Sequence, residues 1–344
     1  MKKAYIILVT LLLSFILMLT GCTGKPAGTT KQGDLSGKRI ALIMQLNLGT
    51  FSAQYIAGVK EQVEKFGGKV TVLASDGDLG KMAANLDAAV NQHFDGILID
   101  HGTPEALQNG IQKAVDKKIP VVVFDANIQI PGVTVLSQGD QEMATSVLEK
   151  LAADHGNKGN LVKIWVAGFA PMERRQVAYQ DFLKQHPDIK EIAAFGAATQ
   201  NTALDTQAQM EAILKKYPKK GQITAVFAAW DEFAKGASRA IKQAGRTEIK
   251  VYGIDMSDED LQMLQDAEGP WVATSAVDPK DIGRVQVRYL YQKLHRDTTP
   301  EQVVLKPSLI TRDRLPREKI TTDQLTKYIK EWGSSQQGNA DWMK

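Results

Sequence analysis

The sequence predicts an α/β protein with two doubly wound domains, each built on a parallel sheet between layers of helices. From residue 40 onwards, short runs rich in β-branched residues alternate with amphipathic helical stretches. Several runs, such as Val121–Phe124, are apolar throughout, which is typical of strands buried on both faces. The alternation restarts near Asp140, and 344 residues suit two such domains.

The first half begins with a strand and alternates from there. We expect strands at residues 40–44, 69–73, 96–100 and 121–124, and helices at 52–66, 81–92 and 104–119. Gly67 and Gly68 end the first helix in the pattern of a left-handed C-terminal cap. Pro104 suits the first turn of a helix, because the N–H that it lacks would have no partner there.

The second half repeats the pattern and closes with a terminal segment. We expect strands at residues 161–166, 189–195, 223–228, 249–254 and 271–277, and helices at 141–154, 173–185, 203–217, 232–244 and 281–294. A last helix is expected over 322–332, followed by a frayed tail over 333–344.

The N-terminus carries a targeting signal. Lys2 and Lys3 precede Ala4–Met18, an apolar stretch too short to span a bilayer and suited to a signal peptide. The following Leu19–Cys22 resembles the bacterial lipoprotein signal, in which the cysteine becomes the acylated first residue. The resemblance implies that residues 1–21 are removed and that Cys22 carries fatty acyl chains such as palmitate. Residues 22–37, rich in Gly, Thr and Lys, would form a flexible tether to the membrane.

Composition excludes several classes of protein. Hydrophobic residues make up 43% and charged residues 24%, and the mean hydropathy of −0.22 excludes a polytopic membrane protein. The net charge of +3 includes Lys2 and Lys3, so no basic face for nucleic acid is expected. The single cysteine excludes an internal disulfide and a cysteine-based zinc site. The five histidines lack the spacing of metal ligands, and the sequence shows no pair of a nucleophile and a base. We therefore expect that the protein binds no metal or cofactor and that it is not an enzyme.

Polar and aromatic residues follow the predicted strands. In open parallel sheets, ligands bind outside the carboxyl ends of the strands. The residues found there are Gln45, Asn47, Phe51, Asp125, Trp230, Asp231, Asp255 and Asp278. Carboxylates accept hydrogen bonds from neighbouring hydroxyl groups, and aromatic faces cover the C–H face of a ring. This edge of the sheets therefore favours carbohydrate binding, although Asp231, just before a predicted helix, suits the N-cap of that helix better than a ligand contact.

Several stretches in the right order resemble one family. They are residues 38–43 with Phe51 and Gly58, 94–99, 119–125, 175–179, 224–237, 253–255 and 281–283. Over Lys38 to Thr311 the chain resembles the type I periplasmic binding proteins of the ribose/galactose class. These are the extracytoplasmic receptors of sugar ABC transporters. The resemblance implies a monomer that binds a sugar or polyol and delivers it to a permease and its ATPase.

The same resemblance implies three crossings between the domains, near Gln138, Val277 and Leu305. The N-terminal lobe would comprise 38–138 plus 278–305, and the C-terminal lobe 139–277 plus 306–332. Closure about this three-strand hinge would bury the ligand between the lobes. The protein would act on the extracytoplasmic face of the cell membrane, in a periplasm or outside a Gram-positive-like cell.

Site residues follow from the resemblance position by position. Phe51 matches a ring-stacking aromatic, Asp125 a sugar-binding carboxylate, and Arg175 an arginine that donates a forked pair of hydrogen bonds. Asp255 matches the carboxylate of the second domain, and Gln45 a small polar position. Arg174 is the alternative to Arg175.

Departures from the family pattern rearrange the expected pocket. Trp230 stands where an Asn is common, Val277 where a Gln or Asn is common, and Ala126 where a second arginine is common. Asn201 lies near a common aromatic position, and Asp278 completes the candidate site. Trp230 either covers a sugar ring or packs under the following helix.

Two other functions share this fold. A sensory receptor would pass its liganded form to a membrane histidine kinase or chemoreceptor, and the fold alone does not separate it from a transport protein. A transcription regulator would need a helix-turn-helix module, whereas the N-terminus holds the signal and tether.

Overall fold

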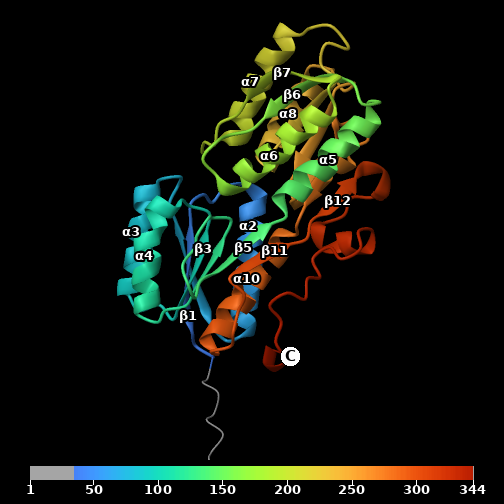
Figure 1. Cartoon of the computed structure of the whole chain (residues 1–344). Coiled ribbons are helices and arrows are strands. Elements are labelled where there is room, and N and C mark those ends of the chain that lie inside the picture. The colour runs from blue at the N-terminus through green and yellow to red at the C-terminus, as the bar shows by residue number, and fades with distance from the viewer. Residues whose placement is uncertain (1–34, 344) are drawn as a thin grey trace, which may run out of the picture. The chain divides into compact units, whose positions relative to one another are not determined.

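The computed structural model describes residues 35–343, which form two lobes around two six-stranded sheets (Figure 1). The expected signal peptide 1–21, the acylation site Cys22 and the tether up to residue 34 lie outside the described residues. Among the helices of residues 35–343, none is long and apolar enough to cross a membrane.

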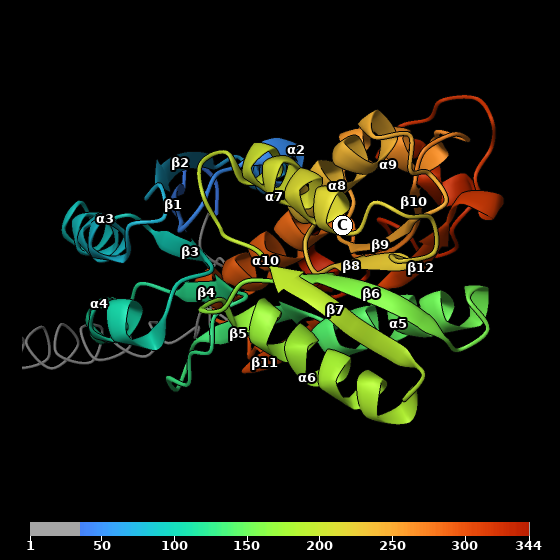
Figure 2. The ribbon, with the colours of Figure 1, turned by 90° about the horizontal axis from the view of Figure 1, so that it is seen from above.

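The N-terminal lobe has an all-parallel sheet in the order β11-β5-β4-β3-β1-β2. Its strands are β1 (Arg39–Met44), β2 (Lys69–Ala74), β3 (Gly96–Asp100), β4 (Val121–Phe124), β5 (Thr134–Gln138) and β11 (Gln302–Leu305). Helices α2 (Gly49–Lys65) and α10 (Pro279–Leu294) cover one face, and α3 (Leu79–Asn91) and α4 (Pro104–Asp116) cover the other (Figure 2). Neighbouring residues of β1 enter different apolar clusters, because side chains alternate along a strand.

The C-terminal lobe repeats this architecture in the order β12-β10-β9-β8-β6-β7. Its strands are β6 (Gly159–Ile164), β7 (Ile189–Phe195), β8 (Ala225–Ala228), β9 (Lys250–Ile254), β10 (Trp271–Ala276) and β12 (Ser308–Thr311). Helices α5 (Asp140–Asp154) and α6 (Ala170–Gln185) lie on one side, and α7 (Thr202–Lys216) and α8 (Asp231–Gln243) on the other (Figure 2). Strand β12 pairs antiparallel with β10, and α9 (Asp258–Gln265) follows β9.

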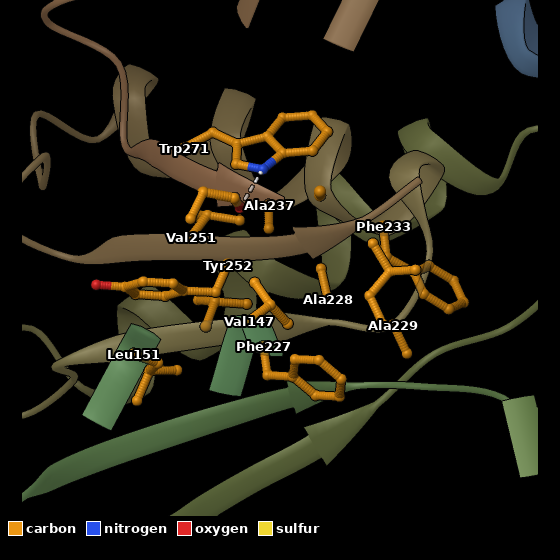
Figure 3. Packing of buried hydrophobic residues seen from close by; sticks show 14 of the residues in the cluster. Val147, Leu151, Phe227, Ala228, Ala229, Phe233, Ala237, Val251, Tyr252 and Trp271 are labelled. Atoms are coloured by element: carbon orange, nitrogen blue, oxygen red, sulfur yellow. Dashed lines mark hydrogen bonds between the residues drawn. The ribbon is translucent and has the colours of Figure 1, made fainter. Parts of the chain in front are cut away.

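The core of the C-terminal lobe shows why its strand runs are apolar throughout. Figure 3 shows Val251 and Tyr252, neighbours on β9, on opposite sides of the sheet. Tyr252 lies on the side of α5 with Leu151, and Val251 lies on the side of α8 with Ala237. With helices on both faces, all of β8 and residues 251–254 of β9 are buried.

The chain passes between the sheets three times. It leaves the N-terminal lobe after β5, returns between β10 and α10, and crosses once more between β11 and β12. Two doubly wound sheets joined in this way confirm the predicted fold class. Strands β5, β11 and β12 and helix α9 did not emerge from the periodicity, because they are short and lack a clear repeat.

The predictions for the C-terminus were wrong. In place of a helix over 322–332, the chain forms a 3-10 helix, η2 (Thr322–Lys327), and then turns. In place of a frayed tail over 333–344, residues 333–343 pack along the N-terminal lobe. Trp342 stacks on His295 with ring centroids 4.3 Å apart, and Met343 is buried. The segment runs from the lobe of β12 to the lobe of α10 (Figure 1).

Candidate functional site

A cavity lies between the lobes, at the carboxyl ends of strands from both sheets. Its volume of about 70 Å³ holds several water molecules or one small ligand. It is lined by Leu46, Leu48, Phe51, Ser52, Tyr55, Asp100, His101, Gln138, Val166, Phe169, Pro171, Met172, Arg175, Trp230 and Asp255. Strand ends of two lobes that meet in one cavity are the position at which doubly wound folds bind ligands.

Four of the predicted site residues line this cavity. Phe51 comes from the first turn of α2, and Arg175 from the first half of α6. Trp230 directly precedes α8, and Asp255 directly follows β9. The structure therefore brings together two aromatic and two charged residues from elements far apart in the sequence.

The other four predicted residues do not line it. Gln45 is buried, and its Oε1 accepts a hydrogen bond from the Gly102 N–H at 2.8 Å. Asn201 is exposed at the start of α7. Asp278 caps α10 by accepting from the Lys280 N–H at 3.0 Å. Asp125 lies behind the cavity, where its Oδ2 accepts from Gln138 Nε2 at 3.3 Å.

Arg174 and Arg175 have different surroundings. Arg175 is 2% exposed, donates from Nε to Asp140 at 2.9 Å and from Nη1 to the Ala229 carbonyl at 2.7 Å, and lies 3.4 Å from Asp255. Arg174 donates to Asp140 at 2.8 Å and reaches across to the N-terminal lobe, where it pairs with Asp125 at 2.6 Å. Arg175 thus faces the cavity, and Arg174 joins the two lobes beside it.

Three residues that directly follow strands adopt left-handed backbone conformations. The φ angles are +62° for His101 after β3, +52° for Asp125 after β4 and +73° for Asp255 after β9. Residues other than glycine rarely adopt this backbone region, and those that do are concentrated at binding and catalytic sites. Here each one turns a polar side chain out of the line of its strand at the edge where the lobes meet.

The electrostatics of the cavity follow from the burial of its acids. Burial raises the pKa of Asp255 to about 6, although Arg175 opposes the shift. Burial and the neighbouring Asp140 raise the pKa of Asp125, against the effect of Arg174. Burial disfavours a charged His101, but Asp100, 2.7 Å away, and Asp125 overcome it and raise the His101 pKa to about 9. At neutral pH the cavity therefore holds the charged donors His101 and Arg175 beside a charged acceptor, Asp255.

Sequence reasoning missed most of the apolar lining and the polar residues Ser52, Asp100, His101 and Gln138. Asp100 ends an apolar strand and His101 follows it, much as Asp125 follows the next strand, so the same signal was present there. Leu46, Phe169 and Met172 lie on the loops and first turns after strands, where nothing in the sequence separates a lining residue from a core residue. Among residues 35–343, no group of three or more His, Cys, Asp or Glu is placed to hold a metal ion.

Comparisons with known proteins agree with this geometry. Residues 40–297 match the model of a family described as periplasmic binding protein domain. The ribose import binding protein of Bacillus subtilis (strain 168) is 26% identical over 303 residues, which cover 86% of this chain and 94% of that protein.

Solved structures are similar at higher identity. A sugar ABC transporter structure from Yersinia enterocolitica subsp. enterocolitica 8081 is 37% identical with a TM-score of 0.87, covering 90% of this chain and 93% of that one. The 5-methylthioribose transporter solute binding protein from Thermotoga lettingae TMO, in complex with 5-methylthioribose, is 36% identical with a TM-score of 0.85. The match covers 89% of this chain and 96% of the Thermotoga chain.

Proposed function

Because this chain belongs to the periplasmic binding protein domain family, we propose that it captures a sugar or polyol and delivers it to an ABC importer. It is a binding protein of a transport family and not an enzyme. The names of its relatives support import rather than the sensing role that the same fold could serve.

One observation carries the proposal for the site. Arg175 and Asp255, both nearly fully buried, meet at the strand ends in a cavity shared by the two lobes. A guanidinium donates and a carboxylate accepts, so together they match the donor and acceptor character of sugar hydroxyl groups. Phe51 and Trp230 add flat apolar surface for the C–H face of a ring. Closure about the three crossings would enclose the ligand.

We further propose that the protein is a lipoprotein anchored through Cys22 on the extracytoplasmic face of the membrane. The sequence Leu19–Cys22 after a short apolar stretch supports this. In cells labelled with a fatty acid, the wild-type chain should carry label, and Cys22→Ser should remain an unlabelled precursor. Labelling of Cys22→Ser at the wild-type level would contradict the anchor.

The binding function is tested with the mature chain in a thermal-shift screen of sugars and polyols. A ligand at ~100 times its Kd should stabilise the protein by about 2.7 kcal/mol. Calorimetry should then show that Asp255→Asn loses roughly tenfold in affinity, because the charged acceptor of the ligand's hydrogen bonds becomes a neutral one.

The control is Asp231→Asn. Asp231 is likewise a buried carboxyl that follows a C-terminal-lobe strand, but it does not line the cavity. Its substitution should leave the affinity within about threefold of wild type. If Asp255→Asn bound the ligand as tightly as wild type, this cavity would not be the binding site.

A further inference from the structure

We propose that the ligand is a monosaccharide that carries one apolar substituent, such as an alkylthio group. The substituent lies between the β1–α2 and β6–α6 connections. This inference rests on the proposed function and specifies the class of sugar. It follows from how polar and apolar side chains are distributed around the cavity.

The first argument is the chemistry of the apolar lining. Leu46, Leu48, Val166 and Met172 are aliphatic or thioether side chains. They offer no flat π face for a sugar ring and no hydrogen-bonding group. A sugar hydroxyl buried against them would lose its hydrogen bonds to water without replacement, which weakens binding. An apolar substituent at the same place would gain from leaving water.

The second argument is that these side chains gather on one side of the cavity. Leu46 follows β1, which lies next to the edge strand β2 of its sheet. Val166 follows β6, which lies next to the edge strand β7 of the other sheet. Gln200 Nε2, after β7, donates to the Asp76 carbonyl, after β2, at 3.1 Å, so these two edges face each other. A Cβ on Gly77 would lie 3.4 Å from Leu46 Cδ2, which places the Leu46 side chain beside this bridge.

The third argument is that polar groups lie towards the other side of both sheets. Asp100 and Gln138 come from the ends of β3 and β5, and Asp255 from the end of β9. Tyr55 lines the cavity, but its hydroxyl donates its hydrogen to Gln286 Oε1 inside the N-terminal lobe. The cavity therefore suits a ligand with hydroxyl groups at one end and an apolar group at the other.

The test is calorimetry with matched pairs of sugars on the mature chain. The probes are D-ribose, D-arabinose and D-xylose, each with its 5-methylthio derivative. Burying a methylthio group in place of a hydroxyl should make at least one derivative bind tenfold or more tightly than its parent. If every parent binds as tightly as its derivative, the inference is wrong and the proposed function stands. If no sugar or polyol binds at all, both are wrong.

Two variants locate the substituent. Leu46→Asn and Val166→Thr nearly preserve side-chain shape but add polar atoms at the apolar end. Each should weaken binding of the preferred derivative by roughly tenfold more than it weakens binding of the parent sugar. The matched control is Leu204→Asn, because Leu204 is 61% exposed on α7. Equal loss for derivative and parent in both variants would place the substituent elsewhere and overturn the assignment.

Discussion

Asp125 and Arg174 form an ion pair that crosses from one lobe to the other. Asp125 follows β4 in the N-terminal lobe, and its carboxylate is 2.6 Å from an Arg174 nitrogen on α6. Asn127, on the same loop, also accepts from Arg174 at 3.2 Å. Asp125, which the resemblance predicted to bind the ligand, thus forms an ion pair between the two lobes beside the cavity.

Trp230 should report ligand binding by fluorescence. It lines the cavity and meets Phe233 edge to face at 5.4 Å, so its indole is fixed in place by the start of α8. Binding of a ligand should change the emission spectrum, and Trp230→Phe should remove most of that change. Trp332→Phe is the control, because Trp332 is buried in the C-terminal lobe away from the cavity. A full signal from Trp230→Phe would place the indole outside the site.

Buried carboxyl groups should make the unliganded protein more stable at mildly acidic pH. Burial raises the pKa of Asp231 from its ordinary 3.8 to about 7, and that of Asp278 to about 6, although Arg284 opposes the latter shift. The folded state therefore binds more protons than the unfolded state between pH ~4 and ~7, and stability falls as pH rises through this window. The raised pKa of His101 adds stability that is lost towards pH 9.

Thermal unfolding should consequently show a higher Tm at pH 5.5 than at pH 8.5, by several degrees. In Asp231→Asn the decline between pH 4 and 7 should be shallower, since one of the proton-binding groups is gone. A Tm that rises steadily from pH 5.5 to pH 8.5 would contradict this account.

Helices α2 and α10 approach each other closely through two glycines. A Cβ on Gly58 would lie 2.1 Å from the Lys280 carbonyl oxygen, and one on Gly283 would lie 2.6 Å from the Tyr55 carbonyl oxygen. These contacts are with backbone, so no side-chain rotation relieves them. The crossing positions Phe51 and Tyr55 on α2 relative to the hinge end of α10.

Gly58→Ala should therefore destabilise the protein by about 1–3 kcal/mol, although alanine ordinarily stabilises a helix relative to glycine. Chemical denaturation measures the change. Lys60→Ala, at an exposed position of the same helix, should stay within ~0.5 kcal/mol of wild type. A Gly58→Ala protein as stable as Lys60→Ala would mean that the helices separate without cost.

The C-terminal segment connects the two lobes in addition to the three crossings. Ile329 and Trp332 are buried in the core of the C-terminal lobe, and Met343 is buried in that of the N-terminal lobe. Between them, Arg288 Nη1 on α10 donates to the Ser335 carbonyl at 2.8 Å. The segment therefore ties the end of the chain across the hinge.

Deleting residues 334–344 should lower stability by roughly 2 kcal/mol or more, because it exposes the surface under Trp342 and Met343. Trp342→Ala should reproduce most of the loss, while the exposed Leu204→Ala should have little effect. Thermal or chemical unfolding measures all three. A truncated chain as stable as the full one would show that the packing of this segment contributes nothing.

The sequence by itself determined the fold class and most of its elements. Val121–Phe124 and Ile189–Phe195 were predicted with the bounds that the structure has. Val121–Phe124 is buried on both faces and must therefore be apolar throughout. The sequence also placed Phe51, Trp230 and Asp255 after predicted strands, at the edge where ligands bind, whereas Arg175 was predicted only from the family resemblance.

Tertiary structure alone decided which of these edge residues meet. Asp100 and Asp125 each end or follow a strand, yet Asp100 lines the cavity and Asp125 pairs with Arg174 behind it. The apolar side of the cavity and the packing of residues 333–343 were likewise beyond the sequence. The reason is physical: local pattern fixes which residues are buried, but which partner buries them depends on contacts between segments far apart in the chain.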